Sequence, residues 1–133
     1  MNKKGFTLVE LLMVVIIIGI LVTLAVPNYY KTIERAKAAK AKATLDLLRK
    51  AELQYQLLYD DFTSNLPELD LVDTAITPST SNDNDWTYAT LATAGDPQTF
   101  VATATRTGGG GDGSTITIDQ DGTVVNGGMA EWD

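Results

Sequence analysis

The chain has 133 residues, of which 44% are hydrophobic, so it has room for one domain with a modest core. It contains no cysteine and no histidine, which excludes disulfides, thiol nucleophiles and histidine general bases, and we therefore expect no enzyme. The formal net charge of -7 is divided unevenly: residues 1–50 hold nine basic and three acidic residues, and residues 51–133 hold one basic and fourteen acidic residues. Such an acidic half repels phosphates, so direct nucleic-acid binding is not expected.

A short leader, residues 1–5, precedes a long hydrophobic segment, residues 6–27. Between Phe6 and Val26 the apolar run is interrupted only by Thr7, Glu10, Gly19 and Thr23. As a helix that rises about 1.5 Å per residue, this run spans roughly 30 Å, the thickness of a hydrocarbon core. It is longer than the apolar region of a secretory signal, and no small-residue cleavage site follows it. We therefore predict a membrane-spanning helix.

The helical pattern continues over residues 28–62 but becomes amphipathic. Apolar residues recur at spacings of three and four, whereas charged residues fall largely elsewhere; the apolar set is Leu47, Leu48, Ala51, Tyr55, Leu58 and Phe62, and the charged set is Lys37, Lys40, Lys42, Arg49, Lys50 and Glu52. We predict one helix from about Phe6 to Asp60. Bends are expected near Gly19 and Pro27, because proline removes a backbone donor and crowds the preceding turn.

Residues 63–133 are predicted to form a loop and a C-terminal β-sheet region. Thr74–Asp85 is rich in polar turn formers and indicates a surface loop. Four short segments then show strand-like composition, namely Trp86–Ala92, Thr99–Thr105, Ser114–Gln120 and Thr123–Asn126. The turns between them contain Gly95-Asp96-Pro97, Gly108–Gly111 and Asp121-Gly122. Ile116 and Ile118 share one strand face, so we expect an α+β fold in which an antiparallel meander of three to four strands packs one dry side on the helix.

Glu10 is the one ionisable residue inside the hydrophobic segment. An ionised carboxylate there costs a few kcal/mol unless it is paired, reaches the interface or takes up a proton. One interpretation is that Glu10, about 6 Å into the segment, reaches back to water or to its own amino group. The alternative is a partner in another copy: if the leader is removed before Phe6, the new amine of one copy can face Glu10 of the next. Such a buried pair contributes register more than stability.

The residues Lys3-Lys4-Gly5-Phe6-Thr7-Leu8-Val9-Glu10-Leu11-Leu12 closely resemble the processing and assembly signature of the type IV pilin and pseudopilin family, and the match extends through Gly19 and Pro27. The resemblance implies cleavage between Gly5 and Phe6 by a prepilin peptidase, methylation of the Phe6 amine, and a contact between that amine and Glu10 of a neighbouring subunit. It also implies that the helix loosens between Gly19 and Pro27 when subunits assemble.

The implied partners are further copies in a helical filament, the prepilin peptidase, the pilus assembly platform and, before assembly, the membrane. The implied location is the inner membrane, with a single pass, followed by an extracellular pilus or a periplasmic pseudopilus. A count of basic residues on the two sides of the span would instead place the C-terminal region in the cytoplasm. We follow the resemblance, because long domains translocate against that bias.

The chain lacks the C-terminal disulfide that many family members have, so strand pairing, packing or a bound ion must hold this region. Calcium is a candidate, with oxygen ligands from Asp83-Asn84-Asp85 or from Asp112, Asp119 and Asp121, although solvated acidic loops explain the same residues without a metal.

Three functions remain open at this point: a structural subunit of a type IV pilus-like filament, a pseudopilin of a type II secretion system, and an unassembled membrane-anchored module. In a filament, the basic stretch from Lys31 to Lys50 of one subunit could lie against the acidic region of another in a salt-dependent contact. A solvated helix face is the simpler explanation for any single lysine.

Overall fold

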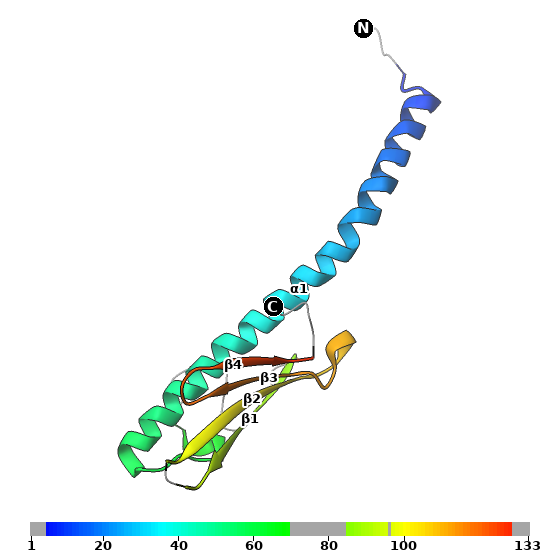
Figure 1. The fold of residues 1–133 in the computed structure, drawn as a ribbon. Helices are drawn as coiled ribbons and strands as arrows, with labels where there is room; N and C mark the ends of the chain where they lie inside the picture. Colours follow the sequence, from blue (N-terminus) through cyan, green and yellow to red (C-terminus); the bar gives the residue numbers. More distant parts are fainter. Residues whose placement is uncertain (1–4, 70–84, 96, 129–133) are drawn as a thin grey trace. The chain divides into compact units, whose positions relative to one another are not determined.

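The computed structural model describes residues 5–69, 85–95 and 97–128. Its elements are α1 (Leu8–Tyr59), the short 3-10 helix η1 (Leu66–Glu68), β1 (Trp86–Thr93), β2 (Thr99–Arg106), the 3-10 turn η2 (Gly109–Gly111), β3 (Thr115–Asp119) and β4 (Val124–Gly127), as shown in Figure 1. Residues 1–4 of the leader, residues 74–84 of the predicted loop, Asp96 and residues 129–133 lie outside the described part. The chain divides into two units, Met1–Glu34 and Arg35–Asp133, which are described in turn.

Helix α1 confirms the predicted helix to within two residues at either end. It remains helical through Gly19 and Pro27, so the bends expected there stay predictions. The helix stops because Asp60 adopts a left-handed conformation with φ of 58° while its N–H still donates to the Gln56 carbonyl at 2.8 Å. A left-handed residue directly after the last turn is a common way for a helix to end.

The first unit has no core of its own among the residues that the structure describes. From Gly5 to Thr32 every side chain is exposed, including the whole apolar run. Within the described residues, α1 is the one helix that is long and apolar enough to cross a membrane. Burial of apolar surface has to come from outside this unit, whether from lipid or from other protein chains.

The second unit contains a four-stranded antiparallel sheet in the order β1-β2-β3-β4, as the sequence predicts. The strand ends differ from the predicted ones by at most one residue. Thr103 pairs with Ala89 on one side and with Thr117 on the other, which fixes the register of the three long strands. Ile116 and Ile118 are buried on one face of β3, and Thr115, Thr117 and Asp119 alternate with them, which confirms the predicted pattern.

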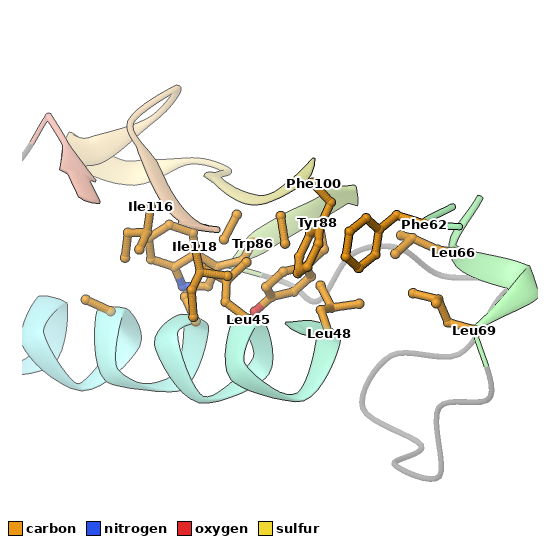
Figure 2. Packing of buried hydrophobic residues seen from close by; sticks show 14 residues of the cluster. Leu45, Leu48, Phe62, Leu66, Leu69, Trp86, Tyr88, Phe100, Ile116 and Ile118 are labelled. Atoms are coloured by element: carbon orange, nitrogen blue, oxygen red, sulfur yellow. The ribbon is translucent and has the colours of Figure 1, made fainter. Parts of the chain in front are cut away.

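The core of this unit lies between the sheet and the C-terminal half of α1 (Figure 2). The helix contributes a buried line at spacings of three and four, namely Ala38, Ala41, Leu45, Leu48 and Glu52. Trp86 and Phe100 from the sheet are fully buried against it, and the Phe62 ring lies 4.9 Å from the Phe100 ring. Alanine at two helix positions lets the sheet approach the helix backbone closely, which leaves room for the large aromatic side chains.

Three predictions about this helix face were wrong. Leu47 is 37% exposed, because it lies one residue away from the buried line and therefore about 100° around the helix. Leu58 is 71% exposed, because it lies in the last turn before the chain reverses at Asp60. Glu52 was grouped with the charged residues outside the apolar stripe, but it lies on the buried line and is 0% exposed.

A buried arginine closes the other end of the core. Arg106, at the end of β2, is only 3% exposed and donates to the Asp85 backbone carbonyl at 2.8 Å and to the Asp85 carboxylate at 3.2 Å. Its guanidinium carbon also lies 5.7 Å from the centre of the Trp86 ring. Lys37 of α1 approaches the same carboxylate at 2.8 Å, so Asp85 connects the helix to two strands of the sheet.

Candidate site at the start of the helix

Glu10 and Thr7 form a reciprocal pair at the N-terminus of α1. The Glu10 carboxylate oxygen Oε2 accepts from the Thr7 N–H at 2.9 Å and from the Thr7 hydroxyl at 2.8 Å. The Glu10 N–H in turn donates to the Thr7 hydroxyl oxygen at 3.2 Å. This arrangement is a capping box, in which Thr7 precedes the helix and Glu10 is its third residue. It satisfies two backbone N–H groups that the first turn of a helix leaves without partners.

The capping box changes the interpretation of Glu10. Thr7 supplies two hydrogen bonds to the carboxylate within the same chain, in addition to any contact that Glu10 makes with water, with its own terminal amine or with another copy. The signal was present in the sequence as Thr-x-x-Glu directly before an apolar run. This pattern predicts a helix cap, which neither of the two sequence-based interpretations of Glu10 includes. If Glu10 turns to a partner in another copy, the Thr7 N–H loses its hydrogen bond to the Glu10 carboxylate and needs another acceptor.

The two residues of the predicted cleavage site are both open. A Cβ added to Gly5 would meet no heavy atom within 4 Å, and Phe6 is 74% exposed. Phe6 lies just before Thr7, so the predicted new amine would be one residue from the capping box. Nothing in the described part of the chain blocks a protease at this peptide bond.

The predicted flexible stretch contains side chains that bond back to the helix. Within the stretch the Thr23 hydroxyl donates to the Ile20 carbonyl at 2.7 Å, and just beyond it the Thr32 hydroxyl donates to the Asn28 carbonyl at 2.8 Å. Bonds of this type compete with the backbone ladder and slightly weaken a helix. A Cβ at Gly19 would also meet open space. Loosening between Gly19 and Pro27 therefore stays a prediction with a local physical basis.

Glu52 is a second glutamate that the sequence interpretation missed. Its Oε2 accepts from the Thr63 N–H at 3.1 Å, across the reversal of the chain at Asp60. Its Oε1 is buried and has no hydrogen-bond partner among the residues that the structure describes. Burial raises the pKa of this carboxyl, and the hydrogen bond from Thr63 only partly opposes that rise. The helix end and the following loop are thus joined through a half-satisfied carboxyl group.

The candidate calcium ligands are used locally. Asp112 accepts from the Gly108 N–H at 2.8 Å, and Asp119 accepts from the Thr123 N–H at 2.8 Å. Asp121 lies in the turn between β3 and β4. Asp83 and Asn84 lie outside the described residues. Within the described ranges, no group of three or more acidic side chains is arranged to hold a metal. Calcium binding stays a prediction.

The basic stretch of α1 is largely engaged within its own unit. Lys37 pairs with Asp85, Lys50 pairs with Asp46 at 2.7 Å, and the Arg49 Nε donates to the Gln120 carbonyl at 3.0 Å. Further interactions involve Arg35, Lys40 and Lys42. Fewer of these cations are therefore available to a neighbouring copy than the charge count suggests.

Comparison with known proteins points to the same N-terminal segment. Residues 1–26 match the family described as the prokaryotic N-terminal methylation motif. This range contains the predicted cleavage site, the capping box and most of the hydrophobic segment.

Several proteins are similar to this chain over a longer stretch. It is 40% identical to the type IV major pilin protein PilA of Myxococcus xanthus over 68 residues, which are 49% of this chain and 31% of that protein. It is 33% identical to the ComG operon protein 3 homolog of Bacillus licheniformis over 70 residues, which are 53% of this chain and 72% of that protein. It is 47% identical to the type IV narrow pilus major component PilA5 of Thermus thermophilus over 51 residues, 38% of this chain and 44% of that protein. The match spans less than half the length of the two pilins. No solved structure matches the chain.

Proposed function

The chain belongs to the type IV pilin and pseudopilin family, and on that premise we propose that it is a structural subunit of a type IV pilus-like filament. The single observation that carries the proposal is the fully exposed apolar half of α1, which begins directly at a capping box made by Thr7 and Glu10. A segment of this kind needs lipid around it in the free subunit and other copies around it in a filament.

Processing comes first in the proposed sequence of events. A prepilin peptidase hydrolyses the peptide bond between Gly5 and Phe6, which releases the leader and creates a new amine on Phe6. That amine is then methylated. The lack of a side chain at Gly5, and the open space around it, would allow the backbone to lie extended in a protease cleft.

Assembly would then exchange partners at Glu10. In the free subunit the two hydrogen bonds from Thr7 would partly compensate the carboxylate near the end of the membrane-spanning segment. In the filament, the Phe6 amine of a neighbouring copy would replace or join Thr7, and the pair would set the axial register between copies. The hydrogen bonds from Thr7 would therefore keep the Glu10 carboxylate in place until a neighbouring copy binds it.

The remaining partners and locations follow from this proposal. The subunit would cross the inner membrane once, with its second unit, the globular unit Arg35–Asp133, on the outer side. It would meet the prepilin peptidase and the pilus assembly platform in that membrane. After assembly it would be part of an extracellular pilus. We propose neither catalytic activity nor direct nucleic-acid binding, because the family consists of structural subunits and the globular unit is acidic.

Mass spectrometry of the N-terminus of the native protein tests the proposal directly. A chain that begins at methylated Phe6 is the expected result. A chain that retains Met1 to Gly5 and stays a lipid-bound monomer would overturn the proposal in favour of an unassembled membrane anchor. In parallel, Gly5→Leu should leave the leader attached, whereas Gly5→Ala, which adds only one methyl group, should be processed at least in part.

The match to the ComG operon protein 3 homolog over 72% of its length keeps a pseudopilin of a type II secretion system as the second candidate. The two candidates have the same processing and the same Glu10 pairing. They differ in where the filament ends, because a pseudopilus stays in the periplasm. Electron microscopy of cells decides between them: surface fibres that disappear on deletion of this chain favour the pilus, and a secretion defect without loss of surface fibres favours the pseudopilin.

A further inference from the structure

A shallow pocket of about 190 Å³ lies beside the C-terminal end of α1. It is lined by Ala51, Gln54, Tyr55, Leu58, Tyr59 and Glu68. All of these residues belong to the second unit and none of them takes part in the N-terminal site, while Ala51 and Tyr55 also pack against the edge of the sheet core. The proposed function described above does not use this pocket.

The pocket combines two aromatic rings with a carboxylate. The ring centroids of Tyr55 and Tyr59 lie 4.5 Å apart. The Tyr55 hydroxyl donates to the Glu68 carboxylate at 3.3 Å, the Thr63 hydroxyl donates to it at 2.7 Å, and the Asn65 amide donates to it at 3.0 Å. These bonds, with that of Thr63 first and that of Asn65 second, lower the pKa of Glu68, so the group is ionised at neutral pH.

The rim of the pocket is apolar and acidic. Leu58 is 71% exposed and Tyr59 is 65% exposed, although both are large hydrophobic side chains at the end of a helix. Asp60 and Asp61 follow directly and are exposed as well. Aromatic faces, an apolar rim and an ionised carboxylate together suit a long side chain that has an apolar stem and a cationic end, which is the description of lysine.

Lys31 of α1 is a cation of this kind without a partner in its own chain, as far as the described residues go. It is exposed, and it follows two exposed tyrosines, Tyr29 and Tyr30, just beyond the hydrophobic segment. The other basic residues of the described helix already have interactions. Tyr55 follows Lys31 by 24 residues in the sequence of α1, which corresponds to about 36 Å of helix contour at 1.5 Å per residue.

We propose that this pocket receives Lys31 of a second copy of the chain, with Tyr30 of that copy against the exposed Leu58. The inference rests on the proposed filament, since it needs two copies displaced along their helices. For Lys31 to meet Leu58, the two copies must be displaced along the helix axis by the length of about 27 residues. The contact between Phe6 and Glu10 needs a much smaller displacement, because these residues are only four apart in the sequence. The two contacts therefore connect a subunit to two different neighbours, and the unequal division of charge between the two parts of the chain serves the second of them.

Cross-linking in assembled filaments tests this contact, and the absence of cysteine gives a clean background. The test variant carries Tyr30→Cys and Leu58→Cys, which leaves Lys31 in place, and the filaments are treated with a short bismaleimide linker. The matched control carries Tyr30→Cys and Leu57→Cys, because Leu57 is adjacent and 87% exposed but does not line the pocket. A ladder of covalent oligomers is expected for Leu58→Cys and not for Leu57→Cys. Filaments that give no ladder, an equal ladder for both, or an adduct with a different protein would overturn the inference.

A second measurement avoids introduced cysteines. Lys31→Met keeps the apolar stem and removes the charge, so filaments should form in lower yield and should lose less stability than wild-type filaments as salt is raised. Lys31→Arg should restore the salt dependence. Equal yield and equal salt dependence for wild type and Lys31→Met would count against the contact. If the wild-type chain itself forms no filaments and keeps its leader, the proposed function fails first, which distinguishes that failure from failure of the pocket contact alone.

Discussion

The two halves of α1 differ in how they bury apolar side chains and in where the hydrogen-bond partner of their carboxylate lies. In the N-terminal half every apolar side chain is exposed, and the one carboxylate, Glu10, is bonded to Thr7 three residues away. In the C-terminal half a line of side chains is buried under the sheet, and the carboxylate on that line, Glu52, is bonded to a residue beyond the end of the helix. The polar groups of the first half are satisfied by near neighbours, but its apolar side chains can be buried only by other molecules. The second half buries one line of side chains within its own unit, so its stability depends on tertiary contacts.

Glu10→Leu gives the largest expected effect. Removal of the carboxylate makes membrane insertion easier, but it deletes the proposed partner of the Phe6 amine, so filament yield should fall to background while processing continues. Electron microscopy and immunoblots of the sheared surface fraction measure the yield.

Thr7→Val separates the two roles of Glu10. This substitution keeps the shape of the side chain and removes the hydroxyl, at a cost of about 1 kcal/mol of local helix stability for a lost cap. If Glu10 acts through a neighbouring copy, Thr7→Val filaments form at near wild-type yield. If Thr7→Val fails to the same degree as Glu10→Leu, Glu10 acts as a helix cap and the pairing between copies is wrong.

Leu48→Ala tests the packing of the C-terminal half of α1 against the sheet. Leu48 is fully buried between α1 and the sheet, so its truncation should lower the free energy of unfolding by about 2–5 kcal/mol. Leu47→Ala, at the neighbouring and partly exposed position, should cost less than about 1 kcal/mol. Urea unfolding of the full chain in detergent, followed by tryptophan fluorescence because Trp86 is buried, provides the measurement. Similar costs for both variants would show that the core does not pack as described.

The periodic features of the fold could be predicted from the sequence, because they depend on near neighbours. The helix, the four strands and the inward position of Ile116 and Ile118 all follow from spacing and turn chemistry. Thr7 was predictable too, since the Thr-x-x-Glu pattern is local.

The burial of Glu52 could not be predicted in this way. Helical spacing places Glu52 on the same line as Ala38 and Leu48, but polarity argues against burial, and the bond that compensates it comes from Thr63 after the chain has reversed. The same limit applies to Arg106, whose partner Asp85 lies 21 residues earlier in the sequence. Contacts of that range depend on how the elements dock, and a single sequence gives no measure of it.

Glu52→Gln should change the pH dependence of stability. Burial raises the folded pKa of Glu52 above the ordinary value of 4.5, so the folded chain holds this proton more tightly than the unfolded chain. The wild-type free energy of unfolding should therefore fall as pH rises from about 4.5 to the folded pKa, by about 1.4 kcal/mol for each unit of pKa difference, and then stay level.

Glutamine can still accept the Thr63 bond and does not ionise, so the difference between wild type and Glu52→Gln isolates this one group. Urea titrations of both proteins at several pH values measure the difference. Parallel curves would contradict the assigned burial. Glu68, whose pKa is lowered chiefly by its bond from Thr63, works in the opposite direction: its stabilisation is present at neutral pH and disappears as the solution is acidified through its folded pKa.

Gly122→Ala addresses the contact between α1 and the last hairpin. Gly122 has φ of +88°, and a Cβ there would lie 3.4 Å from the Arg49 guanidinium carbon, which is held near by the bond from Arg49 to the Gln120 carbonyl. A non-glycine residue in the left-handed region costs about 1–2 kcal/mol, and displacement of Arg49 should add to it. Gly113→Ala, with φ of +81° and open space around the added Cβ, provides the matched control. An equal cost for both variants would show that Arg49 moves aside freely.

Calcium should have the smallest effect. Asp112 and Asp119 already accept backbone hydrogen bonds within their own turns, so a metal would have to compete with those bonds for the same oxygens. We therefore expect the thermal midpoint of the full chain in detergent to be unchanged when calcium is added or a chelator is present. A midpoint that rises with calcium, and no longer does so in Asp119→Asn, would establish a metal site at the C-terminal turns. The globular unit would then depend on a ligand as the N-terminal half of α1 depends on lipid or on other copies.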